Sequence, residues 1–441
     1  MPTSRKRTKK LSKIRFPVPI LGICLICALI LLLFGLALRG CRNENEEIPD
    51  SDSDAVSVTG LPEIADGDFS MFVGHKVLVP EETVLYEVSD GAATPAGTVT
   101  AGALLDIDGS LNSGYLTVAD SPFCIAGSAV QQSDRWFRND TNLVPFAEDL
   151  ATAECFVIRN ESGDAVASVS HAMQFPVYVK PDSGSQYGIR FMNGIYYIDA
   201  SEVSGVNPAQ RETPAQAGEV PVLMYHFFYS EAEGGKRIDG NYVEVNELDE
   251  QLKYISENGF HACTMREIQY WMEGRANLPD HSIAITIDDA DPSVHQYAMP
   301  VFVKYGIHAT NFVICGWQPP EMPYELWEMR ENGMELQSHG FLVHTGGCSG
   351  MGHGGLLLCM DHASGVEDIT RSFDYVDGGF VFCYPFGDIN DNAESIVRDA
   401  GGKLAFTTEG GRINPSMDPL ALPRVRVTGG NGLSAFAASI G

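Results

Sequence analysis

Two adjacent aspartates, Asp288 and Asp289, follow an apolar stretch that is typical of a short buried strand. The segment reads SIAITIDDA, so both carboxylates stand where the strand leaves its sheet. Neighbouring carboxylates that lose hydration repel each other, which is costly unless a positive charge offsets the repulsion. A divalent metal would supply that charge if one aspartate bound it. The other could stay ionised and accept a proton from a water that the metal activates.

Other polar side chains stand at or just beyond the ends of predicted strands, namely His226, His339, His344 and Tyr384. The carboxyl ends of parallel strands meet at one end of a barrel, so we expect these side chains near the two aspartates. Two histidines and a carboxylate are a common ligand set for a catalytic divalent metal. His344 follows His339 by five positions, which does not suit one helical face, so a turn at Gly340 must bring the rings together.

The elements that must position these residues alternate between strand-like and helix-like stretches over the last half of the chain. We predict strands at 220–228, 282–290, 309–316, 334–340, 380–387 and 404–410, and helices at 246–260, 265–275, 296–307, 325–333 and 393–402. The first helix has apolar residues at helical spacing, with Asn246 as its predicted N-cap. Repeated strand–helix units imply a parallel sheet that closes into a distorted (β/α) barrel over residues 219–441.

Residues 61–206 show short alternating or apolar runs broken by Gly, Asp, Asn and Ser, which predicts an all-β region. A weak internal repeat here resembles two bacterial SH3-like modules in tandem. Such modules would bind a cell-wall polymer, and a β-rich spacer without a ligand is the alternative. A linker rich in proline, alanine and glutamine at 207–218 leads to the barrel.

The N-terminal segments predict a membrane anchor. Residues 1–15 form a basic cytoplasmic head, and 16–39 contain an apolar stretch long enough to span a bilayer as a helix. An acidic linker follows at 40–60. This pattern predicts a single-pass protein of the cell membrane with an extracellular catalytic domain. Lipoprotein processing at Cys41, or another cleavage, is the alternative.

Composition excludes one class of partner. The chain has 441 residues, 44% of them hydrophobic and 20% charged, which is typical of a folded protein. Its formal net charge is −29, so it has no general attraction for nucleic acid. No feature of the sequence indicates an oligomeric state.

A glycine-rich segment at 344–362 follows the second histidine of the predicted metal site. Its two cysteines, Cys348 and Cys359, are close enough in sequence to pair. We expect this segment to act as a lid or substrate loop, with an accessory metal role for His353 as the alternative. The glycines do not join a strand to a helix as a phosphate-binding loop does, so nucleotide binding is not indicated.

Taken in order, the segments PVLMYH, ITIDDA, LQSHGFLVH, FCYPFG and ALPRVRVT resemble the polysaccharide deacetylases of carbohydrate esterase family 4, also called NodB-homology domains. The resemblance covers about residues 219–430 and is strongest to the branch in which the catalytic histidine motif stands at the start of the domain. It implies a distorted (β/α) barrel and a metal-dependent hydrolase.

The resemblance implies a role for each matching position. Asp288 would be the general base and His226 the general acid, while a backbone N–H near Tyr384 would help to hold the oxyanion. The ligands of a divalent metal would be Asp289, His339 and His344. We expect zinc, with cobalt, nickel or manganese as alternatives. Pro385 and Phe386 of the same motif would contact the substrate or support the site.

Three positions depart from the family pattern. Ala290 replaces a glycine, which would cost stability if the position needs a positive φ. Cys383 stands where an arginine usually orients the base, and Arg424 and Arg426 are the candidates to replace that arginine. Gly340 replaces a hydroxyl residue that is common after the first metal histidine. None of these departures removes a predicted ligand or the base.

The sequence therefore predicts an enzyme that removes N-acetyl groups from a surface glycan, such as peptidoglycan or another N-acetylglucosamine polymer, and releases acetate. The missing arginine and the SH3-like modules motivate one alternative, a catalytically inactive protein that binds cell-wall glycan. Another alternative is an esterase or amidase that acts on a different acetylated polymer.

Overall fold

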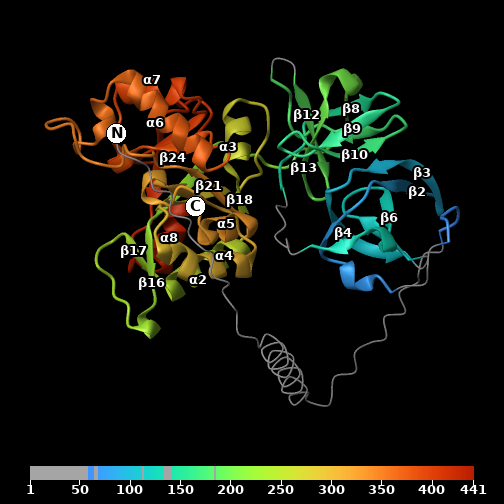
Figure 1. The fold of residues 1–441 in the computed structure, drawn as a ribbon, viewed down its shortest axis with the longest axis horizontal. Coiled ribbons are helices and arrows are strands. Elements are labelled where there is room, and N and C mark those ends of the chain that lie inside the picture. Colours follow the sequence, from blue (N-terminus) through green and yellow to red (C-terminus); the bar gives the residue numbers. More distant parts are fainter. Residues whose placement is uncertain (1–57, 64–67, 112–113, 134–140, 183–184) are drawn as a thin grey trace, which may run out of the picture. The chain divides into compact units, whose positions relative to one another are not determined.

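The computed structural model describes residues 58–63, 68–111, 114–133, 141–182 and 185–441 (Figure 1). The predicted cytoplasmic head and the predicted membrane helix lie outside these ranges. No helix within the described ranges is long and apolar enough to cross a membrane. On this finding we correct the prediction of a single-pass protein of the cell membrane with an extracellular domain and a membrane partner, and we do not carry it further.

The described part of the N-terminal half consists of strands and short 3-10 turns, in agreement with the predicted all-β region. Its strands are β1 (Lys76–Leu78), β2 (Thr83–Ser89), β3 (Ala92–Val99), β4 (Leu104–Leu111), β5 (Tyr115–Val118), β6 (Phe123–Ala126), β7 (Gln131–Gln132), β8 (Glu148–Thr152), β9 (Phe156–Arg159), β10 (Ala165–Val169), β11 (Gln174–Pro176), β12 (Gln186–Phe191), β13 (Gly194–Asp199) and β14 (Val203–Pro208). Antiparallel pairing of β3 with β10 joins the two halves of this region. One apolar core extends through both halves, and the likeness to two SH3-like modules stays a prediction.

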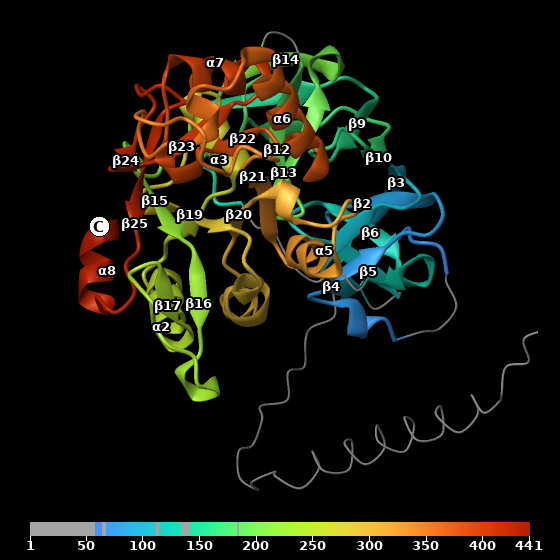
Figure 2. The ribbon, with the colours of Figure 1, turned by 60° about the vertical axis from the view of Figure 1, so that its left-hand side comes forward.

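The C-terminal domain is built on a closed ring of parallel strands (Figure 2). In ring order the strands are β15 (Val220–Tyr225), β19 (Ser282–Asp289), β20 (Ala309–Val313), β21 (Met334–Ser338), β22 (Val381–Cys383), β23 (Leu404–Gly410) and β25 (Leu422–Arg426), and β25 pairs again with β15. Strand β15 is apolar and buried along its whole length, and β19 is buried at every position but its last, as parallel strands covered on both faces are. The predicted (β/α) barrel is thus confirmed.

Shorter elements complete this domain. Its helices are α2 (Val245–Glu257), α3 (Met265–Met272), α4 (Met299–Tyr305), α5 (Tyr324–Glu331), α6 (His362–Tyr375), α7 (Asp391–Asp399) and α8 (Leu433–Ile440), and a π-helical turn η5 (Val294–Ala298) precedes α4. The minor strands are β16 (Phe227–Tyr229), β17 (Tyr242–Glu244), β18 (His261–Ala262) and β24 (Arg412–Ile413). Helices α5 and α6 both contact β21, the strand that leads to the predicted metal histidines.

The helices differ from the sequence prediction in several details, and α8 is not predicted at all. The N-cap of α2 is Glu244, not Asn246, because the Glu244 carboxylate accepts the backbone N–H of Asn246 at 2.6 Å. Helix α6 is not predicted, because glycine, β-branched and small polar residues lower its intrinsic helix propensity. Asp361 caps α6 by accepting the N–H of Ser364, and packing of residues such as Ile369 and Phe373 stabilises it.

Candidate active site

Three of the predicted metal ligands converge at the carboxyl end of the barrel. The Oδ1 atom of Asp289 lies 3.5 Å from Nε2 of His339 and 3.5 Å from Nε2 of His344. The three side chains together could hold one ion, and they are partly or fully buried. Gly340 has a φ of +88°, which provides the turn predicted between the two histidines.

Hydrogen bonding and burial leave the two histidine rings in a form that can bind a metal. Nδ1 of His339 lies 2.7 Å from the carbonyl oxygen of Cys383, so this nitrogen donates its proton there and leaves Nε2 free to bind a metal. Burial lowers the pKa of His339 to about 3 and also lowers the pKa of His344, so both rings are neutral near pH 7. Burial and the nearby charge of Asp288 raise the pKa of Asp289 to about 7. A divalent cation would relieve both effects on Asp289.

Arg424 holds the second aspartate in place. Its guanidinium donates to both oxygens of Asp288, each at 2.7 Å, and the arginine side chain is fully buried. Further donation from Nε to the carbonyl oxygen of Thr407 and from Nη1 to the hydroxyl of Thr286 also holds the guanidinium in place. Burial would raise the pKa of Asp288, but the Arg424 charge holds that pKa well below its usual range. Asp288 is therefore ionised at neutral pH.

The structure distinguishes between the two candidate arginines. Arg424 binds Asp288, whereas Arg426 donates to the side chain of Asn241 at 2.6 Å. Cys383 occupies the position beside this pair, with its sulfur 3.1 Å from an Arg424 nitrogen and 3.5 Å from an Asp288 oxygen. The arginine missing at position 383 is thus replaced in space by one from β25.

His226 lies on the other side of Asp288. It follows β15, and its Nε2 is 3.8 Å from Oδ2 of Asp288, which is too long for a direct hydrogen bond. Burial lowers the pKa of His226, and the Asp288 carboxylate opposes that shift only in part. The ring is therefore neutral at neutral pH and needs a proton before it can act as an acid.

The turn after β22 requires one correction. The N–H of Tyr384 donates to the carbonyl oxygen of Phe406 in the neighbouring strand, and its hydroxyl donates to the carbonyl oxygen of Leu420. Tyr384 therefore has no free donor for an oxyanion. Pro385 has no N–H, so the next donor along the turn belongs to Phe386. None of the hydrogen bonds found among the described residues uses the Phe386 N–H.

Three residues at this end of the barrel have a strained backbone. Asp289, Ala290 and Phe386 have φ values of +78°, +51° and +63°, in the left-handed region that disfavours residues with a Cβ atom. The positive φ at Ala290 confirms that this alanine occupies a position suited to glycine. Strain of this kind persists where the surrounding structure enforces it, and it is common at functional sites.

The glycine-rich segment folds against the same turn. A disulfide joins Cys348 to Cys359. The buried Asp388 carboxylate accepts the backbone N–H groups of His353 and Gly355 and the ring Nδ1 of His353. His353 is thus engaged with Asp388, and it belongs to none of the possible metal-binding groups among the described residues.

A second buried group of possible metal ligands contains His261, Cys263 and Glu267. Glu267 closes a capping box at the start of α3 by exchanging hydrogen bonds with Thr264. It also accepts a hydrogen bond from the hydroxyl of Thr141 and lies 2.9 Å from His261. Sequence reasoning missed this group, although the spacing of Thr264 and Glu267 is a recognisable capping signal.

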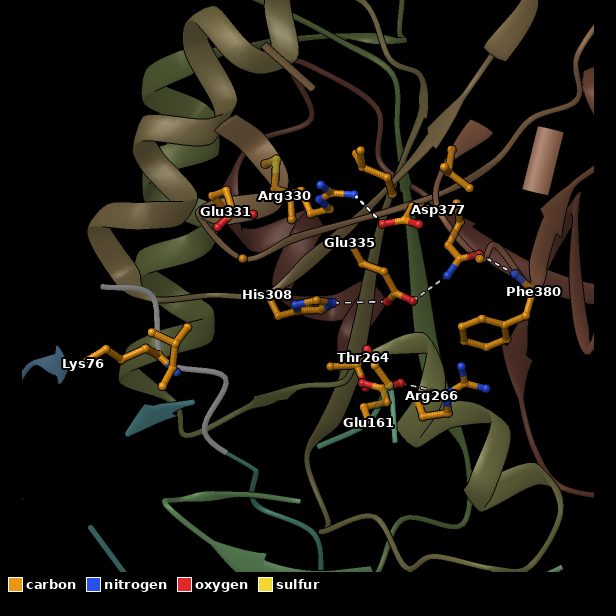
Figure 3. A pocket seen from close by; sticks show the side chains of 18 residues that line it. Lys76, Glu161, Thr264, Arg266, His308, Arg330, Glu331, Glu335, Asp377 and Phe380 are labelled. Carbon is orange, nitrogen blue, oxygen red and sulfur yellow. Dashed lines mark hydrogen bonds and ion pairs between the residues drawn. The ribbon is translucent and has the colours of Figure 1, made fainter. Parts of the chain in front are cut away.

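The large cavity shown in Figure 3, of about 740 Å³, lies away from the candidate catalytic groups. It is lined by His308 and Glu335, which stand at the starts of β20 and β21, and by Arg266. His339 follows the opposite end of β21. The cavity therefore belongs to the amino end of the strands, whereas active sites of such barrels occupy the carboxyl end.

Comparison with known proteins agrees with the site geometry. Residues 275–405 match the family model described as polysaccharide deacetylase. This chain carries a polysaccharide deacetylase domain. The matched residues contain the aspartate pair, the two histidines predicted to bind a metal and the Tyr384 turn, and the relatives are hydrolases that act on carbon–nitrogen bonds.

Individual relatives of the deacetylase domain cover about half of the chain. A poly-beta-1,6-N-acetyl-D-glucosamine N-deacetylase of Staphylococcus aureus (strain MSSA476) is 25% identical over 216 residues, which are 46% of this chain and 72% of that protein. The putative polysaccharide deacetylase YxkH of Bacillus subtilis (strain 168) is 28% identical over 238 residues, 52% of this chain and 77% of that one. Among solved structures, the deacetylase PplD of Streptococcus pyogenes in complex with acetate is 22% identical, with a TM-score of 0.44, and covers 51% of this chain and 98% of that one.

Proposed function

We propose that this protein is a metal-dependent N-deacetylase that hydrolyses the acetamide groups of an N-acetylglucosamine glycan, such as peptidoglycan, and releases acetate. The observation that carries the proposal is the ionised Asp288 carboxylate, held by Arg424 directly beside a two-histidine, one-aspartate ligand set. We also propose that residues 219–441 form the catalytic domain and residues 61–206 a separate β-rich domain.

The proposed metal ligands are Asp289, His339 and His344. Their chemistry fits a divalent cation, because both rings are neutral and the buried carboxylate has a raised pKa of about 7 in the absence of a cation. Zinc suits this donor set, and cobalt, nickel or manganese could replace it. When bound, the metal would polarise the acetamide carbonyl and make the attacking water more acidic.

The proposed general base is Asp288. The two hydrogen bonds from Arg424 fix both carboxylate oxygens, so that the base keeps one orientation. As the water attacks the carbonyl carbon, its proton goes to Asp288. Because its pKa is far below the usual range, protonated Asp288 is a strong acid and passes the proton on readily.

The proposed general acid is His226, which lies 3.8 Å from Asp288. It receives the proton and delivers it to the nitrogen of the departing amine, so that the carbon–nitrogen bond breaks with a neutral amine as leaving group. The same proton thus moves from water to product through two side chains. The N–H of Phe386, in place of Tyr384, is the proposed backbone donor to the oxyanion.

The proposed substrate class rests on the relatives. The matched protein of Staphylococcus aureus is named for deacetylation of poly-beta-1,6-N-acetyl-D-glucosamine.

Arg424 occupies the space of the missing arginine, which supports an active enzyme over an inactive glycan-binding protein.

Acetate release by the purified chain tests this proposal. N-acetylglucosamine oligomers and peptidoglycan would be incubated with the enzyme, with and without added zinc or cobalt. We expect metal-dependent release, and we expect Asp288→Asn to lose about a hundredfold or more of it while it still binds metal, because asparagine cannot accept the proton. If metal is bound but no glycan yields acetate, the proposal is wrong and glycan binding without catalysis becomes the better account.

A further inference from the structure

Exposed aromatic side chains flank His344, one of the proposed metal ligands. Trp317 is 67% exposed and Phe386 is 39% exposed. The centroid of the His344 ring lies 5.4 Å from that of Trp317 and 4.9 Å from that of Phe386. Exposed apolar surface that gathers in one place commonly marks a binding site, whereas scattered single residues need no such explanation.

The exposed side chains come from three neighbouring strands. Trp317 ends the short turn η6 (Cys315–Trp317) after β20, and Phe386 lies in the turn η8 (Pro385–Gly387) after β22. Leu342, which is 61% exposed, lies between β21 and His344. All three residues therefore follow the carboxyl ends of their strands, where barrel enzymes bind their substrates.

The structure holds the Phe386 ring in this exposed position at a conformational cost. Phe386 has a φ of +63°, although a bulky residue disfavours the left-handed region. Two residues further on, the buried Asp388 carboxylate accepts three N–H groups from the disulfide-closed glycine-rich loop. The loop approaches closely, since a Cβ atom at Gly352 would lie 2.4 Å from an Asp388 oxygen. The hydrogen bonds from the disulfide-closed loop to Asp388 hold the turn that contains Phe386.

We propose that Trp317, Leu342 and Phe386 form a stacking platform for a sugar ring of the glycan, next to the unit whose acetamide reacts. One face of a pyranose ring consists of C–H groups, and such an apolar face packs favourably on an aromatic side chain. Because both aromatic rings of the platform contact His344, a sugar bound there lies directly beside the proposed metal site. The inference rests on the proposed function and adds recognition of a second sugar unit.

A second exposed tryptophan of the same domain provides a matched control. Trp327 is 44% exposed on α5, and its ring contacts that of Tyr324 instead of the catalytic groups. It lines a different pocket, together with Met299 and Val303 of α4. Replacing it removes an exposed indole without touching the platform.

Kinetics on substrates of two lengths test the platform. Acetate release from an N-acetylglucosamine pentamer and from the monomer would be measured for the wild type, Trp317→Ala, Trp317→Phe and Trp327→Ala. We expect Trp317→Ala to lower kcat/KM for the pentamer about tenfold, mainly through KM, with a smaller loss on the monomer. Trp317→Phe should restore most of the loss, and Trp327→Ala should match the wild type. Equal losses on pentamer and monomer, or no loss, would overturn the platform.

Binding without turnover separates this inference from the proposed function. Calorimetry with the pentamer would compare Asp288→Asn with the double variant that also carries Trp317→Ala, and we expect about tenfold weaker binding in the double variant. If this difference appears but the wild type releases no acetate, the platform stands and the proposed activity fails. If the wild type releases acetate and binding does not depend on Trp317, the platform alone fails. Trp317-dependent binding to phosphatidylglycerol vesicles, with none to the pentamer, would also overturn the platform.

Discussion

In the barrel domain, the spacing of one group of side chains around Glu267 and of another around Asp289 would suit a metal ion, and the two groups differ in how their carboxylate oxygens are satisfied. In the first group, Glu267 receives hydrogen bonds from Thr141, Thr264 and His261. In the second group, Asp289 lies 3.5 Å from each of its histidine nitrogens, a separation longer than a good hydrogen bond.

The charge state of the two carboxylates follows from that difference. Burial would raise the pKa of Glu267, but the His261 charge and three hydrogen bonds lower it, so the carboxylate is already stabilised by protein groups. Burial and the charge of Asp288 instead raise the pKa of Asp289. Spacing alone therefore does not identify a metal site. A carboxylate with a raised pKa beside neutral histidines is the better indication, because a cation would stabilise its ionised form.

The largest expected effect contrasts one histidine from each group. His339→Ala should abolish metal binding and lower acetate release by more than about a hundredfold, since even residues that only orient a metal ligand contribute ten- to a hundredfold. His261→Ala should keep one equivalent of metal and release acetate normally wherever it remains folded. Metal analysis of both purified variants, together with the acetate assay, checks this contrast. Loss of metal from the His261 variant alone would reverse the assignment.

The second prediction concerns stability. Glu267→Gln should lower the free energy of unfolding by about 3–5 kcal/mol, because it leaves the buried His261 without its charged partner. The exposed pair of Lys253 and Glu257 on α2 provides the control, and Glu257→Gln should change stability by less than about 1 kcal/mol. Urea unfolding measures both variants. Similar small losses in the two would show that the buried group contributes little to stability.

The third prediction is a pH dependence of metal affinity. The raised pKa of Asp289, about 7, means that a proton competes with the metal below that pH. Lowered pKa values keep His339 and His344 from competing near neutrality. The apparent affinity should therefore fall about tenfold per pH unit below pH 7 and level off above it. Titration with zinc at several pH values measures this, and an affinity that stays constant below pH 7 would contradict it.

The smallest expected effect comes from the strained backbone beside the aspartate pair. Ala290→Gly should stabilise the protein by up to about 1 kcal/mol, because glycine adopts the positive φ at this position without steric cost. Ala435→Gly, at an exposed position within α8, should instead destabilise it by about 1 kcal/mol. Thermal unfolding compares the two variants, and shifts of the same sign would show that the φ at Ala290 imposes no strain.

The sequence predicted the barrel and the meeting of the aspartate pair with His226, His339 and His344, because strand ends in a parallel barrel share one end. It could not choose between Arg424 and Arg426. Both lie on the same face of β25, two residues apart, and they differ only in their position along the strand. Arg424 lies within the strand and is buried, whereas Arg426 ends it and is exposed. The alternation of residue types along a strand shows which face a residue is on, but it does not show how deeply that residue is buried.

Two other features depended on contacts between distant segments. Whether Tyr384 or Phe386 offers a free N–H depends on the bond from Tyr384 to Phe406, a residue of the neighbouring strand. Whether a carboxylate is already satisfied depends on partners such as Thr141, which lies far from Glu267 in the sequence. Local sequence patterns do not encode such partners.

Anomalous diffraction from crystals of the protein grown with zinc is the most direct test of the central claim. Data collected at the zinc absorption edge locate the metal without reference to activity. The account predicts one strong peak between Asp289, His339 and His344, at about 2.0–2.2 Å from each ligand atom, and none at the Glu267 group. A peak at the Glu267 group, or zinc bound elsewhere in an active enzyme, would contradict it.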